Sequence, residues 1–154
     1  MTEKADRGGQ EAQRLFRFFN EIGIIAQLSG AAVEKVRPGT MTLPQFSVLN
    51  HLVRIGDGRT PLEIARALQV SKGAMTNTLG HLERSGWILV RPDDHDGRSK
   101  RVDLTDSGRH AHGQAIAAVA PELAWLSGVV STGDLDQLLP VLETVRKALD
   151  ARRN

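Results

Sequence analysis

Cysteine is absent from this chain of 154 residues. Without a thiol, the sequence excludes a disulfide framework, a cysteine-type zinc site, a thiol nucleophile and a cysteine redox sensor. No apolar run reaches membrane-spanning length, which predicts no membrane partner. The first residues, MTEKADRGGQEAQR, are polar and lack the apolar core of a signal peptide, so we expect a cytoplasmic protein.

Aromatic residues are scarce, with four Phe and two Trp. Charge of one sign is not dominant either, because 20 basic and 18 acidic residues leave a formal net charge of +2. That total neither requires nor excludes a nucleic-acid partner, so the local distribution of charge has to decide. Hydrophobic residues make up 40% of the chain, enough for one globular domain with its own core.

Apolar residues recur at helical spacing near both ends of the chain. The spacing predicts a first helix over residues 10–37, after an irregular segment at residues 1–9, with a breaker cluster at residues 37–39. It also predicts a helix from Asp106 to Ser127 and a last helix capped by Ser131 and Asp134. Pro121 and Pro140 lie inside these two helices and are expected to kink or break them.

The middle of the chain carries three helix starts in quick succession. Thr42 with Gln45, and Thr60 with Glu63, form capping-box patterns, and Ser71 is a favourable N-cap. The predicted inward-facing residues of the three helices are Phe46, Leu49 and Leu52 or Val53; then Leu62, Ala65 and Leu68; then Met75, Leu79 and Leu82. Ser85 and Gly86 should end the third of these helices.

Two alternating segments follow, and they predict a β-hairpin. Residues 87–91 alternate as a strand does, Asp96-Gly97 is a turn dipeptide, and Val102 with Leu104 marks the returning strand. Thr105 can then cap the next helix. Two short helices followed by a hairpin indicate a helix-turn-helix with a wing, which places one helix in a DNA groove and a loop beside it.

The helix that begins after Ser71 has the surface that a DNA groove requires. With Met75 and Leu79 turned inward, its outer face is small and polar, and helix N–H groups can approach phosphate. The predicted DNA contacts on it are Ser71, Lys72, Gly73, Thr76 and Asn77. An ordinary solvated face explains the helix alone equally well.

The predicted wing adds a second basic element. Arg98, Lys100 and Arg101 follow the turn and could reach phosphates and the narrow minor groove. The acidic residues before them, at positions 93, 94 and 96, would repel phosphate unless they hold basic partners. We expect Asp96 to orient Arg98 across the turn; a charge-balanced exposed loop is the alternative.

These segments together resemble the MarR family of bacterial winged-helix regulators. The resemblance covers nearly the whole chain through TLPQFSVLNHL, VSKGAMTNTLGHLERSGWI and RPDDHDGRSKRVDLTDSG, the last being the most specific. It implies a mainly α fold with a small β-hairpin wing: one MarR-like chain over 1–154, a winged helix-turn-helix at 42–105, and dimerisation helices at 10–37 and 106–152. It further implies a homodimer, a roughly palindromic double-stranded operator and, often, a small-molecule effector.

The dimer contacts are expected on the apolar faces of the terminal helices, at Leu15, Phe18, Ile22, Leu135, Leu138, Leu142, Val145 and Leu149. Three residues depart from the family pattern. Gln69 stands in the helix-turn-helix link where Gly is common, and Asn77 and Gly80 replace bulkier or charged residues. These departures leave the operator sequence open.

The resemblance suggests a dimeric repressor that a small aromatic or phenolic effector releases from DNA. Phe19 and Phe46 could line an effector pocket between the first two helices, although plain core packing is the favoured alternative. No cofactor and no catalytic set is predicted.

The alternative hypothesis is a metal-dependent protein or a scaffold that uses the helical dimer interface without binding DNA. Asp106 and His110 could share a helix face as metal ligands, but we favour solvated helix histidines. The histidines are His51, His81, His95, His110 and His112.

Overall fold

The computed structural model describes residues 2–35 and 41–152, and it divides into two compact units, Met1–Val36 and Arg37–Asn154. The first unit is a single helix, α1 (Thr2–Lys35). The helix begins at Thr2, so the expectation of an irregular segment at residues 1–9 is wrong from Thr2 onward. The predicted breaker cluster at residues 37–39 lies outside the described residues.

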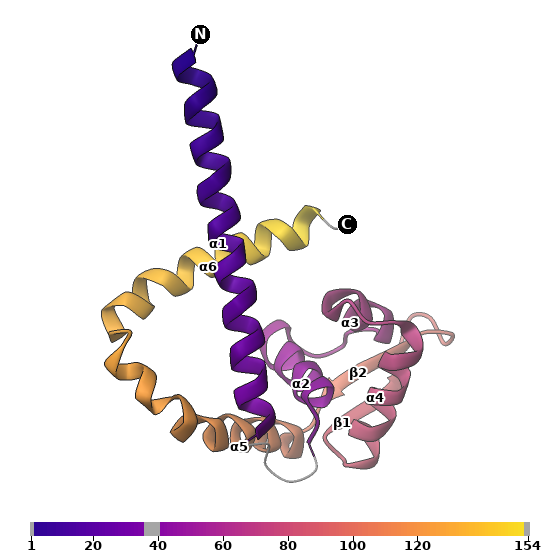
Figure 1. The fold of residues 1–154 in the computed structure, drawn as a ribbon. Coiled ribbons are helices and arrows are strands. Elements are labelled where there is room, and N and C mark those ends of the chain that lie inside the picture. The colour runs from indigo at the N-terminus through magenta and orange to yellow at the C-terminus, as the bar shows by residue number, and fades with distance from the viewer. Residues whose placement is uncertain (1, 36–40, 153–154) are drawn as a thin grey trace. The chain divides into compact units, whose positions relative to one another are not determined.

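The second unit contains the winged helix (Figure 1). Its elements are α2 (Leu43–Ile55), α3 (Pro61–Leu68), α4 (Lys72–Arg84), β1 (Ile88–Pro92) and β2 (Lys100–Leu104). The two strands are antiparallel, with Ile88 opposite Leu104 and Pro92 opposite Lys100. The predicted fold class, mainly α with a small hairpin wing, is confirmed.

The helix starts form as the capping patterns predict. The hydroxyl of Thr42 accepts the N–H of Gln45, and the amide oxygen of Gln45 accepts the N–H of Thr42. Thr60 and Glu63 repeat this reciprocal pair at the start of α3. Such caps satisfy N–H groups that the helix itself leaves unpaired, so local sequence alone determines where each helix begins.

The core of this unit joins all five winged-helix elements to α5 (Asp106–Leu123). The side chains of Leu49, Leu52, Ile64, Leu82 and Val102 are fully buried. The core also contains Met41, Val48, Ala65, Met75, Leu79, Ile88, Leu104, Ala111 and Ala115, with Phe46 and Leu68 partly buried against it. Most predicted inward residues are therefore confirmed.

One predicted inward position is wrong, and one open alternative is decided. Leu62 is 50% exposed, and the fully buried residue of α3 is Ile64. In α2, Val53 is exposed and Leu52 is buried, which settles the alternative left by the spacing. Leu62 and Ile64 lie at opposite edges of the inner face of an eight-residue helix, so a small rotation about the axis exchanges them, and packing against α4, α2 and β2 sets that rotation.

The C-terminal part of the unit runs through α5, a short 3-10 helix η1 (Ala124–Gly128) and α6 (Thr132–Arg152), which bend away from one another in Figure 1. The helical stretches on either side of residues 129–131 differ in direction by 112°. The α-helix predicted to reach Ser127 instead ends at Leu123, two residues after Pro121. By contrast, α6 continues through Pro140 as one helix, so of the two expected outcomes, a kink or a break, the break does not occur there.

Within the described residues, no single helix has both the length and the apolar character needed to cross a membrane. The bent pair formed by Asp106–Gly128 and Thr132–Arg152 meets those two requirements only when its two halves are taken together.

Candidate nucleic-acid interface

Helix α4 presents the two faces that its sequence predicts. Met75, Leu79 and Leu82 are buried, whereas Lys72 and Asn77 are exposed. Gly73, Thr76 and Ser71 are also exposed, and Gly80 is half-buried. The hydroxyl of Ser71 accepts the N–H of Ala74, which makes Ser71 the N-cap.

The polar groups on the outer face of α4 differ in whether they already have a hydrogen-bond partner. The Thr76 hydroxyl donates to the carbonyl of Lys72, 2.9 Å away, but its oxygen can still accept a hydrogen bond. The amide of Asn77 has no hydrogen-bond partner among the described residues. Asn77 is therefore the side chain on this face with both a free donor and a free acceptor, the pair of groups that reads an adenine edge.

The turn between α3 and α4 depends on a left-handed residue. Gln69 has φ 55° and ψ 41°. Among the described residues it is the only non-glycine residue with a positive φ. The N–H of Val70 then donates to the carbonyl of Ala65, which closes the end of α3. This geometry explains why Gly suits the position, since an L side chain in this region costs about 1–2 kcal/mol.

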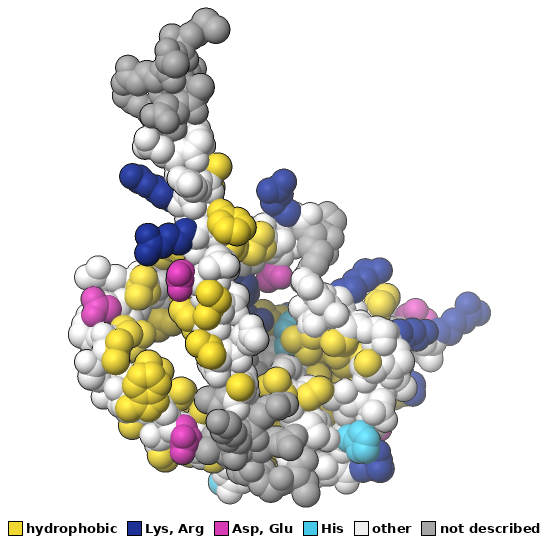
Figure 2. Space-filling model, viewed as in Figure 1, with side chains coloured by type: hydrophobic (Ala, Val, Ile, Leu, Met, Phe, Trp, Pro, Cys, Tyr) yellow, Lys and Arg dark blue, Asp and Glu magenta, His cyan; other side chains and the backbone are white. Residues whose placement is uncertain are grey.

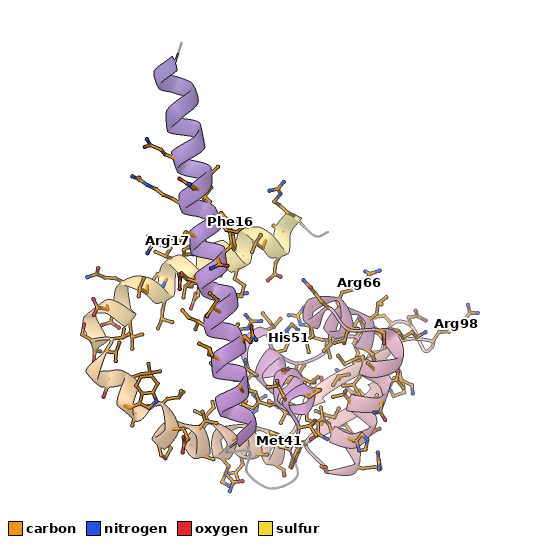
Figure 3. All side chains as sticks on the ribbon, in the orientation of Figure 1. Phe16, Arg17, Met41, His51, Arg66 and Arg98 are labelled. Atoms are coloured by element: carbon orange, nitrogen blue, oxygen red, sulfur yellow. The ribbon has the colours of Figure 1, made fainter. Side chains whose placement is uncertain are left out.

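The wing consists of β1, β2 and a loop over residues 93–99. A turn at its tip is closed by the N–H of Ser99 donating to the carbonyl of Asp96, 2.8 Å away. Arg98 lies in this turn, and Figure 3 shows its side chain pointing away from the helices. Its guanidinium has no ion pair with any described residue, and Figure 2 shows Lys and Arg side chains along this outer edge of the winged helix.

The acidic residues before the turn do hold partners, as their position suggested. The carboxylate of Asp93 accepts the guanidinium of Arg101, and that of Asp94 accepts Arg91 at 3.2 Å. Asp96 accepts the backbone N–H of Arg98 at 3.0 Å, so it orients Arg98 through the main chain and not through the guanidinium.

Arg101 is the predicted DNA contact whose surroundings differ most from expectation. Its guanidinium binds Asp93, donates to the carbonyl of Gly58 at 2.9 Å and lies 4.0 Å from Glu63. Most of its hydrogen-bonding capacity is therefore used inside the protein. Arg98 and Lys100 keep exposed side chains. Two of the three wing cations therefore face solvent, whereas the third, Arg101, is paired within the protein.

Asp93 is the buried carboxylate of the wing, with 8% of its surface exposed. The N–H of His95 and the guanidinium of Arg101 hold the pKa of Asp93 below its usual range, and they outweigh the opposing effect of burial. Asp93 is consequently charged at neutral pH and anchors both the start of the loop and β2.

The segment before α3 ties the wing to the helices. The N–H of Gly58 donates to the carbonyl of Val102, and the N–H of Val102 donates to the carbonyl of Arg59. Asp57 accepts the N–H of Leu104 and the guanidinium of Arg109, both at 2.8 Å. Residues 57–59 therefore link β2 to α3 and α5, with one isolated antiparallel bridge between Arg59 and Val102.

The start of α5 is packed against the start of the wing. The hydroxyl of Thr105 accepts the N–H of Gly108 and donates to the carbonyl of Gly86. A Cβ at Gly108 would lie 2.0 Å from the carbonyl oxygen of Trp87. The sequence pattern identified Gly108 only as part of a motif; the structure shows that the site has no room for a side chain.

Two of the histidines contradict the expectation of solvated positions. His51 and His112 are each 7% exposed. The ring of His112 stacks on Phe46 with centroids 5.2 Å apart, and its Nε2 lies 3.1 Å from the side-chain oxygen of Asn50. Burial lowers the pKa of His112, so the ring is neutral at neutral pH. His112 lies on the side of α5 that packs against α2.

No group of three or more His, Asp or Glu side chains in the described part of the chain is arranged to hold a metal ion. His110 and Asp106 are both exposed on α5.

The two aromatic residues considered for an effector pocket lie in different units. Phe46 packs partly buried against the core and on His112. Phe19 is 45% exposed on α1, and its ring meets that of Phe18 edge-on with centroids 5.4 Å apart. Plain core packing was favoured for both residues; Phe46 fits it, whereas Phe19 is not a core residue of the single chain.

The predicted dimer residues leave large apolar faces on the single chain. No residue of α6 is buried, and Leu138 on it is 51% exposed. Leu135, Leu142 and Leu149 on α6 are exposed as well, Val145 is half-buried, and on α1 Leu15 is exposed while Phe18 and Ile22 are half-buried. Figure 2 shows hydrophobic side chains gathered over the arc of α5, η1 and α6.

The sequence pattern of the MarR family matches residues 40–99 of this chain. The chain is 31% identical over 149 residues to the transcriptional activatory protein BadR of Rhodopseudomonas palustris, covering 95% of this chain and 82% of that protein.

Two solved structures of MarR from E. coli are similar in fold. The wild-type apo form has a TM-score of 0.67 and 26% identity, covering 82% of this chain and 94% of that one. A cysteine-to-serine variant complexed with operator DNA has a TM-score of 0.63 and 26% identity, covering 86% of this chain and 95% of that one.

Proposed function

The chain belongs to the MarR family of winged-helix transcriptional regulators, and we propose that it binds double-stranded operator DNA sequence-specifically as a homodimer. The observation that carries this proposal is the outer face of α4. It is small and polar at its N-terminal half, it is exposed, and it lies in the same unit as an outward-pointing wing arginine. The MarR structure in complex with operator DNA supports the same use of the fold.

In this proposal α4 lies in the major groove. Gly73 and Thr76 allow close approach, Ser71 and the first N–H groups of the helix approach phosphate, and Lys72 reaches phosphate or guanine. The free amide of Asn77 reads a base edge. Each good base contact of this kind contributes about 1–3 kcal/mol of discrimination against the wrong base.

The wing supplies affinity without reading sequence. Arg98 and Lys100 are the exposed cations at its tip and edge, and we assign them to phosphates and the minor groove. Arg101 was expected to bind DNA with them. Its pairs with Asp93 and Gly58 support a different role, in which it holds the wing in the orientation that Arg98 needs.

The homodimer is proposed on the exposed apolar faces of the terminal helices. A face such as that of α6, with Leu135, Leu138, Leu139 and Leu142 all exposed, is larger than a stable monomer normally leaves in water. A two-fold dimer presents two copies of α4, so the operator should consist of two half-sites about 34 Å apart.

Repression released by a small aromatic or phenolic effector is the mode of control that we propose first. It requires only that the dimer cover a promoter and that a ligand favour a conformation that binds DNA less tightly. Activation is a second candidate, because the relative that matches 95% of this chain is named a transcriptional activatory protein. Transcription from the bound promoter in vitro, with and without the protein, separates the two.

The test of DNA binding starts from selection of bound sequences from a random duplex pool. The recovered duplex and a scrambled duplex are then titrated at two salt concentrations. We expect sequence-selective, salt-sensitive binding, with a dyad-symmetric footprint. A scaffold or a metal-dependent protein would yield no enriched sequence and no preference between the two duplexes.

A further inference from the structure

We propose that Arg66, on the last turn of α3, binds a backbone phosphate of DNA beside the N-terminal end of α4. A third element of the winged helix thereby joins α4 and the wing at the DNA. The inference rests on the proposed function, because the phosphate belongs to the duplex that α4 and the wing bind.

Arg66 lies on the outer side of α3. The helix buries Ile64 and Ala65. At 3.6 residues per turn, Arg66 lies about 160° round the helix axis from Ile64. Its side chain is exposed. Figure 3, which labels Arg66 and Arg98, shows both side chains extending outward from the winged helix.

The charge of Arg66 is not neutralised within the chain. Its guanidinium makes no hydrogen bond or ion pair with any described residue. Glu63 lies three residues earlier, at a spacing that permits an ion pair on a helix. However, the carboxylate of Glu63 accepts the N–H and the hydroxyl of Thr60, at 2.7 and 2.9 Å. The cap that begins α3 thus holds the neighbouring acid away, and the guanidinium stays available to a ligand.

The stretch of chain around Arg66 lacks acidic residues. Residues 64–82 contain no Asp or Glu, and their Lys and Arg residues are Arg66 and Lys72. A solvated protein surface mixes charges of both signs. The exposed helix α6 does so, since Arg146 there pairs with Asp150 at 3.4 Å. Uncompensated positive charge at the end of α3 and the start of α4 therefore points to an anionic partner.

The link between the two helices places Arg66 beside the start of α4. The carbonyl of Arg66 accepts the N–H of Gln69, and the carbonyl of Ala65 accepts the N–H of Val70, so α3 ends in a tight turn. Ser71, the N-cap of α4, follows at once. When the second helix of such a pair lies in the major groove, the first helix crosses the phosphate backbone. An outward cation on the last turn of α3 is then next to the phosphates that the N-terminal N–H groups of α4 approach.

A cation at this position has one alternative role that needs no DNA. The last carbonyl groups of a helix carry a partial negative charge, which a nearby arginine stabilises. That role affects only the stability of the folded chain, so it predicts a DNA affinity that is independent of Arg66. The affinity for DNA and its salt dependence therefore distinguish the two roles.

The informative variants are Arg66→Gln, which removes the charge, and Arg66→Lys, which keeps it. Binding of the full chain to the selected and the scrambled duplex is measured at several salt concentrations. We expect Arg66→Gln to bind both duplexes about tenfold less tightly, and to reduce the salt slope by about 1.8, or about 0.9 for each copy of Arg66 in a dimer. Arg66→Lys should recover most of the affinity, because a phosphate accepts a point charge. Unchanged affinity and slope for Arg66→Gln would overturn the proposal.

Arg54→Gln is the matched control, because it removes the same charge from another exposed position of the winged helix. Arg54 lies near the end of α2, outside the helix-turn-helix link. We expect its loss to weaken DNA binding less than about twofold, since a distant exposed charge is screened by salt. Equal losses for Arg54→Gln and Arg66→Gln would reduce the effect to general electrostatic attraction and reject a contact by Arg66.

The partner phosphate is identified from the DNA side. Single phosphates of the selected duplex are replaced, one position at a time, by neutral methylphosphonates. At one position in each half-site, we expect the replacement to weaken binding of the wild-type chain about tenfold. The same replacement should leave binding of Arg66→Gln unchanged, because that contact is already lost. If no position shows this dependence on Arg66, the residue has no phosphate partner and the proposal fails.

Failure of the proposed function gives a different result. If the wild-type chain binds no duplex, DNA is not the partner of this fold and both proposals fail together. If the wild-type chain binds the selected duplex and Arg66→Gln binds it equally well, only the assignment of Arg66 fails.

Discussion

The winged helix and α6 differ in how their apolar surface is used. In the winged helix, Leu49, Ile64 and Val102 from three different elements are fully buried against one another. In α6, no residue is buried, although its apolar residues recur at the same helical spacing. The same kind of pattern therefore marks a core in one region and an uncovered face in the other, and only the presence of a packing partner distinguishes them.

The largest expected effect comes from a charge placed on the uncovered face. Leu142→Asp should weaken dimer association by several kcal/mol, because a carboxylate in an apolar interface loses its hydration. Light scattering over a range of protein concentrations measures the change. Gln137→Asp on the same helix adds the same charge to a polar position and should leave the dimer intact. An unchanged dimer for Leu142→Asp would remove α6 from the interface.

A smaller side-chain change should damage the packed region. Gly108→Ala should lower the free energy of unfolding by about 1–3 kcal/mol or more, because the added methyl group meets the carbonyl oxygen of Trp87. Thermal or urea unfolding measures this effect. Gly113→Ala is the matched control in the same helix, where nothing lies within 4 Å of the new Cβ, and it should stabilise by about 0.5–1 kcal/mol. Equal behaviour of the two variants would contradict the close approach of α5 to the wing.

Substitutions on the outer face of α4 and at the wing tip should change the affinity for DNA and not the free energy of unfolding. Asn77→Ala should cost about 1–3 kcal/mol on the selected duplex and relax the preference at one base pair. Arg98→Ala should weaken selected and scrambled DNA alike and reduce the salt slope by roughly one unit per lost phosphate contact. Affinities of both variants at several salt concentrations decide this. If Asn77→Ala weakened both duplexes equally and Arg98→Ala changed only binding to the selected duplex, the roles assigned to helix and wing would be exchanged.

The wing should lose stability in acid through Asp93. Because its pKa is lowered in the folded state, its charge stabilises the fold above the ordinary Asp pKa of about 3.9, and this contribution disappears as pH falls through the folded value. The free energies of unfolding of wild type and Asp93→Asn should differ by a constant amount from pH 7 to about 5. The difference should shrink below about 4 and vanish once the pH is below the lowered folded pKa of Asp93. A difference that persists unchanged at pH 3 would show that the charge of Asp93 is not responsible.

The smallest effect is expected at the helix-turn-helix link. Gln69→Gly should stabilise the chain by about 0.5–1 kcal/mol, because relief of the left-handed conformation exceeds the extra chain entropy of Gly. Urea unfolding measures the gain. Val70→Ala, next in sequence and exposed, provides a control that leaves the backbone conformation unaltered. Destabilisation by Gln69→Gly would mean that the Gln69 side chain makes a contribution larger than its strain.

Several features of the fold and of the site could be predicted because they depend on residues close in sequence. Thr42, Thr60, Ser71 and Thr105 begin their helices as expected, since a cap involves only neighbours three residues away. The inner and outer faces of α4 follow from a period of 3.6 residues. The predictions that the structure corrects depend instead on which elements pack together. Ile64 is buried in place of Leu62, and His51 and His112 are buried as well.

What the sequence by itself determined is thus the order of the elements, their starts, the basic wing and the polar face of α4, because caps, turns and periodicity act over a few residues. Tertiary structure alone decided the partners of distant charges. Arg101 was indistinguishable from Arg98 as a wing cation until the fold brought it to Asp93 and to Gly58, 43 residues away. Likewise, only the fold buried His51 Nδ1 and Arg59 Nε without partners, because burial depends on residues that are remote in the chain.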